Sequence, residues 1–564
     1  MKRFGVEKFK GLLVSGSCAG LVEYLMGLSD SIVAGHLLGE EALVGINLLS
    51  PVMTTVTFFA GLIGVGTGIN YSYESGRCDT RRAREFFTQG LLTACGIGLV
   101  LFLALLFGRG AFLSFMSPSA RIASEAAAYW RWYVPSGLLE PLVVFTVNAV
   151  MTDGDTRLCF SCYIVQLAVN VSVSLLAVGP MGIAGCSFGT FVANVVALGL
   201  LSTHYLRRSN TYALVRHFSV RDTLTIMKSS FGDSSTFLCS AALFFFLNKY
   251  VLVNYGDGQM PVLAAVIALI GFLEVFNGVS NALSPVVTVY AGERNVRAIR
   301  TMMAVADRWA FGEGVALTLV VAVFPGLVVS LVGIDEPELR VAAASAVRWV
   351  SLGLVCYSAV YLYNSYYIFV GHEGMAVALT VLNSLVMPVA LVSLLGRFGP
   401  GWTWASLAFA PLVAMAIFAT WLTFRYGLSK FPLLLDRSRE RRIAMFDLVL
   451  EENAIVDVSR RVANVIHAFG GSPSAAMRAS LMTEEVFMAI RDRNGSRKVL
   501  AEATVDANDG IVLTLRDDGE IFDITDADQK ISSLRTFLVA SVMERQKSRR
   551  NLVTTGFNRN VFRF

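Results

Sequence analysis

The sequence predicts an α-helical polytopic membrane protein with twelve transmembrane helices in two six-helix lobes, followed by a small cytoplasmic α/β domain. Of its 564 residues, 55% are hydrophobic and 16% are charged, and the mean hydropathy is +0.60. A soluble chain of this length would divide into domains rather than require so much apolar surface. Apolar windows of about 20 residues, the length of a membrane-spanning helix, recur up to residue 425. The pattern turns polar after Pro432.

Twelve of these windows are candidate spans. They lie at 11–38, 44–72, 86–108, 125–150, 159–179, 182–204, 231–256, 261–290, 308–333, 345–370, 375–396 and 402–425. The N-terminal segment has the basic start and apolar continuation of a signal peptide. Its apolar run is long and contains Glu23 and Asp30, so we expect it to be retained as the first helix.

Basic residues concentrate in the loops that follow even-numbered spans. These loops hold Arg77, Arg81, Arg82 and Arg84, then Arg207, Arg208, Arg216, Arg221 and Lys228, then Arg294, Arg297 and Arg300, and finally the arginines of 425–442. The positive-inside rule places these loops and both termini in the cytoplasm. The architecture suits a bacterial inner membrane. The net charge of +5 therefore reflects topology, and we expect no nucleic-acid partner.

The eight cysteines predict neither a metal site nor a redox centre. They lie mostly within the spans, and Cys159 and Cys162 are the only close pair. No histidine cluster accompanies that pair, so small, apolar helix-packing residues are the better interpretation.

A short internal repeat supports two lobes of the same orientation. The segment YESGRCDTRRAR follows the second span, and VYAGERNVRAIR follows the eighth. When Gly76 is aligned with Gly292, Arg81 matches Arg297 and Arg84 matches Arg300, at a constant offset of 216 residues. This offset corresponds to six helices. The two lobes should therefore be related by an axis along the membrane normal.

Asp30 is the most informative residue of the first span. A carboxylate near the middle of a bilayer costs a few kcal/mol at least, about 2.5–3.5 on insertion scales, so it marks a functional site that faces a cavity. Glu23 lies seven residues earlier, on about the same helical face. Glu140 in the fourth span is a weaker candidate of the same type.

Several segments in order resemble the multidrug and toxic compound extrusion (MATE) transporters. The resemblance covers residues 10–430. It includes LSDSIVAGHLLGEEAL around Asp30, with Gly35 and Gly39 in register, the DGDTR turn after the fourth span, and GPMGIAGCSFGT at the start of the sixth. It implies an antiporter that exports small organic, often cationic, compounds by alternating access, driven by inward Na⁺ or H⁺. We therefore expect a transporter rather than an enzyme, without a cofactor.

The resemblance also implies the coupling residues. In one branch of the family an aspartate of the first helix works with polar residues of the fifth and sixth, which correspond here to Asp30, Asn170 and Thr190. Ser174 stands where that branch has a second aspartate. Oxygen atoms of Asp30, Asn170, Ser174 and Thr190 could still hold Na⁺ in part. Alternatively, Asp30 carries a proton alone, and H⁺ is favoured over Na⁺.

The second lobe departs from the other branch of the family, because its tenth helix has no acidic residue. Lys249 in the seventh span and Glu274 in the eighth suggest a buried ion pair, either structural or part of a substrate-linked or proton-linked switch. Tyrosines crowd the tenth span, and Tyr361 and Tyr366 are candidates for a wall that stacks substrates, or for helix-packing residues. The segment YWRWY at 129–133 is expected to form an outer interfacial belt.

The expected domains are an N-lobe at 1–216, a C-lobe at 217–432 and a cytoplasmic domain at 433–564. The last begins with a basic anchor, RSRERR. It then shows helices at 452–469, 473–491 and 531–545 and strands at 498–506, 510–516 and 551–563.

This tail resembles the GHKL-type ATPase domains of histidine kinases and gyrases, closest to anti-sigma-factor kinases. Glu485 matches the acidic position of the Glu-x-x-x-Asn helix, and Asp517 and Gly519 match the Asp-x-Gly turn. Ala489 replaces the asparagine that holds Mg²⁺, and no glycine-rich segment surrounds the phosphates. Nucleotide binding is therefore doubtful, and we expect a regulatory domain with a possible cytoplasmic protein partner.

Two other functions remain open at this point. The first keeps the fold but makes the chain a lipid or glycan flippase, as relatives in the wider superfamily are. The second is a membrane-tethered signalling protein that acts through its C-terminal domain. The intramembrane carboxylates and the repeat argue against helices that serve only as an anchor.

Overall fold

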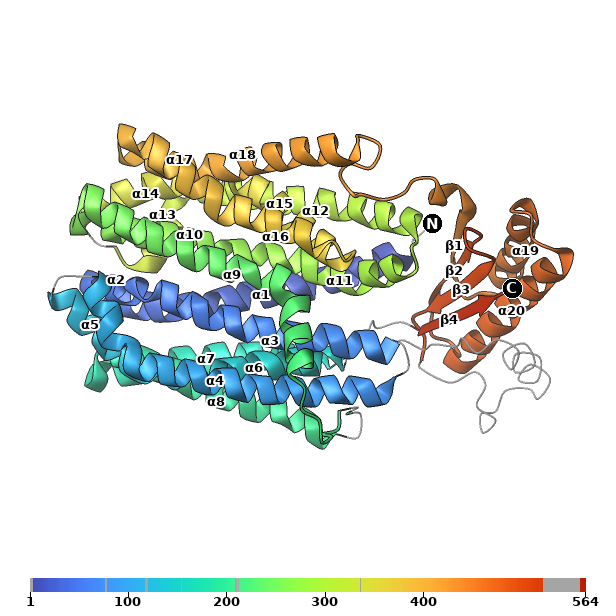
Figure 1. The fold of residues 1–564 in the computed structure, drawn as a ribbon, viewed down its shortest axis with the longest axis horizontal. Helices are drawn as coiled ribbons and strands as arrows, with labels where there is room; N and C mark the ends of the chain where they lie inside the picture. The colour runs from blue at the N-terminus through green and yellow to red at the C-terminus, as the bar shows by residue number, and fades with distance from the viewer. Residues whose placement is uncertain are drawn as a thin grey trace.

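The computed structural model describes residues 4–76, 79–116, 120–153, 155–207, 210, 212–334, 336–520 and 558–564. It consists of a long helical bundle with a small α/β unit at one end (Figure 1). The start of the bundle's first helix and the C-terminus both lie at this end, which we call the tail end. The predicted α-helical membrane fold is confirmed.

The first half of the bundle runs to residue 206. Its helices are α1 (Phe4–Leu37), α2 (Glu40–Leu48), α3 (Ser50–Gly76), α4 (Thr80–Met116), α5 (Ala120–Tyr133), α6 (Ser136–Thr152), α7 (Thr156–Met181), α8 (Ala184–Ser202) and the short η1 (Thr203–Leu206). Asp155 caps α7 by accepting a hydrogen bond from the backbone N–H of Leu158.

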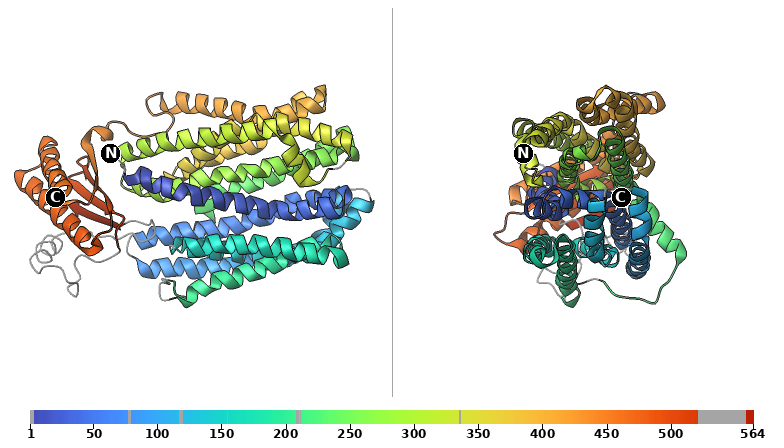
Figure 2. Two further views of the ribbon diagram at one scale, coloured as in Figure 1. Left: turned by 180° about the vertical axis from the view of Figure 1, so that it is seen from behind. Right: turned by 90° about the vertical axis from the view of Figure 1, so that its left-hand side faces the viewer.

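The second half begins with α9. Its elements are α9 (Val220–Tyr255), η2 (Asp257–Gln259), α10 (Met260–Gly271), η3 (Phe272–Phe276), α11 (Asn277–Gly292), α12 (Val296–Val323), α13 (Pro325–Val332), α14 (Pro337–Ser351), α15 (Leu354–Phe369), α16 (Glu373–Val381), η4 (Leu382–Val386), α17 (Met387–Leu395), η5 (Gly396–Phe398) and α18 (Pro400–Tyr426). The two halves lie side by side along the bundle (Figures 1 and 2).

Several expected spans are bent helix pairs in the structure. Among the described residues, 7 helices are long and apolar enough to cross a membrane, or up to 10 if each bent pair is one span. The windows at 125–150 and 345–370 correspond to α5–α6 and α14–α15, which bend by 52° and 48°. The chain is therefore a multi-pass membrane protein, while the number of twelve spans stays a prediction.

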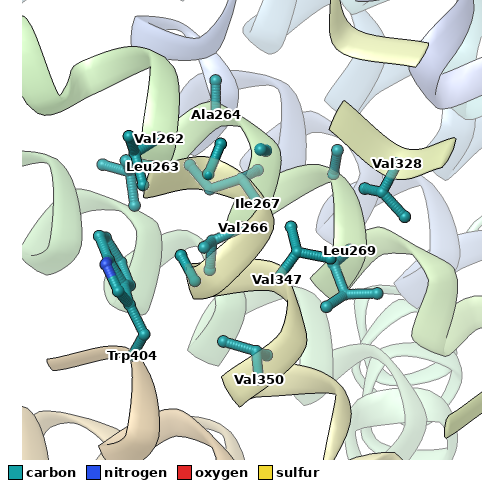
Figure 3. Close-up of a cluster of buried hydrophobic side chains, with 14 of the residues drawn as sticks. Val262, Leu263, Ala264, Val266, Ile267, Leu269, Val328, Val347, Val350 and Trp404 are labelled. Carbon is teal, nitrogen blue, oxygen red and sulfur yellow. The ribbon is translucent and has the colours of Figure 1, made fainter. Parts of the chain in front are cut away.

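Apolar packing within the second half forms a large core. It includes Val262 to Leu269 of α10, Val347 and Val350 of α14, and Trp404 of α18, all buried (Figure 3). Helix α10 is apolar all round, as expected of a helix that is surrounded by others.

The two halves contact each other through α3 with α9 and through α1 with α11. Close approach depends on glycine at two positions. A Cβ atom on Gly66 of α3 would lie 2.2 Å from the carbonyl oxygen of Ile226 in α9. A Cβ atom on Gly35 of α1 would lie 2.2 Å from the carbonyl oxygen of Val332 in α13. Any larger side chain would push the halves apart at these points.

The C-terminal unit follows a short helical turn, η6 (Arg439–Arg442). It consists of β1 (Ile443–Val449), α19 (Glu452–Ala468), α20 (Pro473–Asn494), β2 (Leu500–Asp506), β3 (Val512–Asp517) and β4 (Asn558–Arg563). The strands pair antiparallel in the order β1-β2-β3-β4. Alternate residues such as Ala503, Leu515 and Phe562 face the two helices and form a core with Val462 and Phe487.

Strand β1 was not expected from the sequence. Its segment IAMFDLV directly follows the basic stretch and lacks clear polar alternation, so the sequence pattern does not identify it as a strand. The expected helix at 531–545 and the first part of the last strand lie outside the described residues. The expected helices at 452–469 and 473–491 and the two middle strands agree with α19, α20, β2 and β3 to within a few residues.

Candidate functional site

Asp30 of α1 lies at the centre of a buried polar network in the first half of the bundle. Its side chain is 6% exposed. Its Oδ2 accepts hydrogen bonds from the Tyr129 hydroxyl at 2.6 Å and from the Thr190 hydroxyl at 2.8 Å. Its Oδ1 is 3.4 Å from Nδ2 of Asn170. Four separate helices, α1, α5, α7 and α8, therefore meet at one carboxyl group.

Asn170 holds the network together from α7. Its Nδ2 donates to Thr190 at 2.9 Å, and its Oδ1 accepts a hydrogen bond from the Ser29 hydroxyl at 2.6 Å. Both ends of the amide are thus used, which fixes the orientation of the group. Asn170 and Thr190 were predicted from the sequence, and the structure brings both to Asp30.

Ser174 does not contact Asp30 in this structure. Its hydroxyl is fully buried and donates to the carbonyl oxygen of Cys186 at 3.3 Å. Gly189 of α8 packs against this point, because a Cβ atom there would lie 2.1 Å from Ser174 Oγ and 2.8 Å from the Asn170 carbonyl oxygen. The serine therefore joins α7 to α8 in this structure, and its part in ion coupling stays a prediction.

Tyr129 is the residue that sequence reasoning missed. The YWRWY segment was expected at an outer membrane interface, but Tyr129, Trp130 and Tyr133 are 2%, 3% and 5% exposed. The indole of Trp130 donates to the Leu105 carbonyl oxygen at 2.8 Å. The signal was present in the spacing, since Ala126 shares the helical face of these three rings. The hydroxyl of Tyr129 is thus one of the groups that contact Asp30.

The network offers Asp30 three uncharged donors. Within the described part of the chain, Asp30 forms no ion pair, and no group of three or more His, Cys, Asp or Glu side chains could hold a metal ion. Such a site can stabilise an ionised carboxylate through hydrogen bonds, and its charge can be neutralised by one proton or one small cation.

The other predicted site residues of the bundle lie elsewhere. The side chain of Glu23 is outside the described residues, as is that of Glu274. Lys249 is exposed on α9, six residues before the helix ends, so the prediction of a buried ammonium is wrong. Its aliphatic stem allows the charge to reach the membrane surface.

The tyrosines of α15 serve packing and anchoring. Tyr366 is fully buried, and its hydroxyl donates to the Leu433 carbonyl oxygen at 2.7 Å. Tyr367 donates to Pro432 in the same way at 2.8 Å. Tyr366 thus fastens the connection to the C-terminal unit, and a role for it in substrate binding stays a prediction. Tyr361 is partly buried in the core, with its ring 6.3 Å from that of Phe276.

Three further carboxyl groups lie within the bundle, of which Glu140 was expected from the sequence but Asp307 and Glu313 were not. Glu140 of α6 accepts a hydrogen bond from the Thr57 hydroxyl at 2.6 Å. Asp307 of α12 accepts one from Tyr363 at 3.4 Å. Glu313, on the same helix, has a buried Oε2 without a hydrogen-bond partner among the described residues.

A pocket of about 460 Å³ opens between the two halves. Its walls come from α3, α9 and α16 and are mostly apolar, with Lys228 and Glu373 as the charged members. They are Phe58, Phe59, Leu62, Met227, Lys228, Phe231, Gly232, Glu373, Gly374 and Val377. One apolar space with one charge of each sign suits an amphipathic organic molecule.

The predicted nucleotide residues of the tail form a closed turn. Asp517 is buried, and its Oδ1 accepts hydrogen bonds from the Gly519 N–H at 2.9 Å and from Asn558 Nδ2 at 2.7 Å. Burial raises the pKa of Asp517 to about 6. A Cβ atom on Gly519 would lie 2.6 Å from the Asn494 amide. Protein groups thus occupy the turn. On α20, Ala489 stands one helical turn after Glu485 and offers no ligand for a metal ion. The residues of this turn and helix therefore do not fit a magnesium nucleotide.

The fold and this buried site define a class: a helical membrane bundle in two halves with a polar site inside its first half. The family model MatE matches residues 17–176. No curated protein matches the chain significantly.

Solved structures extend the match over both lobes. An inward-facing multidrug resistance MATE family transporter of the MOP superfamily aligns with a TM-score of 0.64 and 20% identity, over 72% of this chain and 96% of its own. An outward-facing structure of a multidrug resistance MATE family transporter aligns with a TM-score of 0.64 and 20% identity, over 75% of this chain and 98% of its own. A MOP superfamily transporter from Pyrococcus furiosus aligns with a TM-score of 0.66 and 20% sequence identity, over 75% of this chain and 98% of its own. This chain therefore has a MatE segment and the fold of MATE family transporters.

Proposed function

We propose that this protein is a secondary active transporter that exports small organic compounds by alternating access, in exchange for H⁺ through Asp30. The tail end of the bundle faces the cytoplasm in this proposal, in keeping with the positive-inside rule. The existence of the fold in inward-facing and outward-facing forms supports alternating access. The division into two lobes and a tail domain, at residues 216 and 432, is part of the proposal.

The single observation that carries the proposal is the buried carboxyl group of Asp30 and its three uncharged donors. Na⁺ binds best to several oxygen ligands together, as hard cations do. Here Ser174 is turned away, and Oδ1 of Asp30 has one partner at 3.4 Å. One proton neutralises a lone carboxylate without further ligands, so H⁺ is favoured over Na⁺.

Protonation would change how α5, α7 and α8 hold α1. The ionised carboxylate of Asp30 accepts hydrogen bonds from Tyr129 and Thr190. These bonds are strong because their acceptor is charged. A proton on Asp30 weakens these contacts, and α1 then becomes free to shift relative to α5 and α8. Since α1 also packs against α11 of the second half, this shift can pass to the contact between the halves.

The test is efflux from proteoliposomes under an imposed pH or Na⁺ gradient, comparing wild type with Asp30→Asn. The matched control is Glu41→Gln, because Glu41 is an exposed carboxylate paired with Arg121. We expect pH-driven export in wild type and control and none in Asp30→Asn. Export that persists in Asp30→Asn would refute the role of Asp30. Export driven by a Na⁺ gradient alone would show that the coupling ion is Na⁺ and not H⁺.

The pocket between the halves favours one second candidate, a lipid or glycan flippase. Its apolar walls with Lys228 and Glu373 would accept an amphipathic lipid as well as a drug. Proteoliposomes that contain fluorescent phospholipids separate the two, since a flippase moves the lipid and an exporter of soluble compounds does not.

A further inference from the structure

One face of the C-terminal sheet carries a row of charged side chains that runs across all four strands. Asp447 of β1 pairs with Glu502 of β2, Glu502 with Arg516 of β3, and Arg516 with Arg559 of β4. This face lies opposite the helices α19 and α20, so solvent should cover it in an isolated domain. Instead, Glu502 and Arg516 are 1% and 0% exposed.

The turn between α11 and α12 of the bundle covers this charged row. Glu293 in the turn forms ion pairs with both Arg516 and Arg559, which lie next to each other on the sheet. The hydroxyl of Tyr290 donates to Glu502 at 2.8 Å, and the Arg516 guanidinium lies 4.8 Å from the centre of the Tyr290 ring. Glu293, from the membrane part of the chain, thus shares its negative charge between two adjacent arginines, and Arg516 also forms an ion pair with Glu502 within the sheet.

The backbone of the turn is shaped for this contact. Arg294 has a φ of 56°, in the left-handed region, and Asn295 caps α12 by accepting a hydrogen bond from Ala298 N–H at 3.0 Å. Arg297 donates to the Ile443 carbonyl oxygen at 3.2 Å, at the start of β1. The second half of the bundle therefore holds the sheet at several points along one turn.

The same unit also holds the start of α1, which belongs to the first half. The backbone N–H of Phe4 donates to Asp447 at 2.8 Å, and Lys8 forms an ion pair with Asp518 at 3.2 Å. Helix α1 packs directly on α11 at this end, where a Cβ atom on Gly5 would lie 2.9 Å from the Tyr290 hydroxyl. One rigid sheet thus contacts both halves at the point where they meet.

We propose that the C-terminal unit is a built-in brace that locks the tail ends of α1 and α11–α12 together, and that its release is required for the bundle to open at this end. The proposal rests on the transport cycle proposed above, because an opening at the tail end separates the two halves there. The C-terminal unit binds to the bundle of the same chain. Ion pairs make up much of this contact, so a change in charge on either side can regulate docking of the unit.

The first arm of the test measures docking in the full-length protein by hydrogen exchange. Glu293→Gln keeps the shape of the side chain but removes the charge shared by Arg516 and Arg559. We expect faster exchange in peptides from 290–300, from 500–517 and from 4–13. Asp457→Asn is the matched control, because Asp457 forms an exposed ion pair with Arg461 on α19, away from the bundle. Glu293→Asp should restore part of the protection.

The second arm measures transport in proteoliposomes with the same variants. We expect Glu293→Gln to raise the initial rate at least about threefold, since one charge-assisted contact of this kind is worth more than that factor in an equilibrium. Lys8→Ala, which removes an accessible side chain, should raise the rate by a smaller factor without affecting folding.

Two results would overturn the brace. Unchanged exchange in all three segments of Glu293→Gln would mean that the sheet is not held by this turn. Faster exchange with an unchanged or lower transport rate would mean that the docked unit does not restrain opening. A wild type that moves no compound under either gradient contradicts the transport function instead, and peptide 4–13 then still reports whether release of the unit frees α1.

Discussion

At the scale of single residues, the Asp30 network depends on hydrogen-bond donors that the sequence identified only in part. We expect Tyr129→Phe to lower the transport rate about tenfold or more, because a hydrogen bond to a charged group contributes roughly 1.5–3 kcal/mol. The assay is efflux from proteoliposomes at fixed gradient. Tyr212→Phe serves as the control, since that hydroxyl donates at 2.8 Å to the carbonyl oxygen of Ala149 rather than to Asp30. Equal rates for both variants would exclude Tyr129 from coupling.

The C-terminal unit should depend on pH through Asp517. Burial raises the pKa of this carboxyl from 3.8 to about 6. The folded unit therefore binds the proton more tightly than the unfolded chain does, and the stability due to this proton is complete below about pH 4 and lost as pH rises through 6. The contribution is at most about 3 kcal/mol.

Urea denaturation of the full-length protein at pH 4.5 and pH 7, followed by hydrogen exchange in β3, measures this dependence. Asp517→Asn keeps an oxygen for the Gly519 N–H and for Asn558, and it should flatten the difference between the two pH values. A variant that keeps the full difference would assign the pH dependence to other groups.

At the scale of elements, helix contacts set the geometry of the site. Gly189→Ala should lower the transport rate strongly, because its Cβ atom would meet Ser174 Oγ and the Asn170 carbonyl oxygen and would separate α7 from α8. Gly199→Ala on the same helix has nothing within 4 Å of the new methyl group. That control should leave transport unchanged and favour the helix by about 0.5–1 kcal/mol. Similar losses in both variants would contradict the packing argument.

The sequence predicted helices well and their bends poorly. Hydropathy locates a window such as 125–150, since burial in lipid depends on average composition. It does not report that α5 and α6 bend by 52° or that Tyr129 is buried, because both depend on packing against other helices. Asp30 could be identified because a carboxylate within an apolar span is costly, and Asn170 and Thr190 because the resemblance carries their positions. Tyr129 was missed, because the spacing that places it on one helical face with Ala126, Trp130 and Tyr133 does not separate a buried face from an interfacial belt.

Strand β1 and the charged row show a second limit of the sequence. Glu502 and Arg516 alternate with apolar neighbours, as on any exposed sheet face. Only the paired register and Glu293, more than two hundred residues earlier, show that this face is buried. Lys249 was misplaced for the opposite reason, since its position within an apolar window did not show that it faces outward.

At the scale of the whole molecule, the pocket between the halves links specificity to opening. Its walls come from α3 on one side and from α9 and α16 on the other, so its shape changes when the halves move. We expect Glu373→Gln to reduce export of cationic compounds and Lys228→Gln to reduce export of anionic ones, each several-fold, since each change removes one charge from the pocket.

Competition between dyes of opposite charge, measured in the same proteoliposomes, tests this selectivity. Phe58→Leu, which keeps the pocket apolar, provides a control for changes in shape. Equal effects of both charge variants on both dyes would show that the pocket does not select by charge.

Helix α1 is continuous from Phe4, beside the C-terminal sheet, to Asp30 in the buried network. At 1.5 Å per residue these two residues are about 39 Å apart along one helix. Thermodynamic reciprocity then applies to its two ends. If a proton on Asp30 changes the docking equilibrium of the sheet by some factor, docking of the sheet changes the proton affinity of Asp30 by the same factor. If Asp30 couples transport as proposed, a ligand that displaces the sheet would thus shift the pH at which Asp30 takes up its proton.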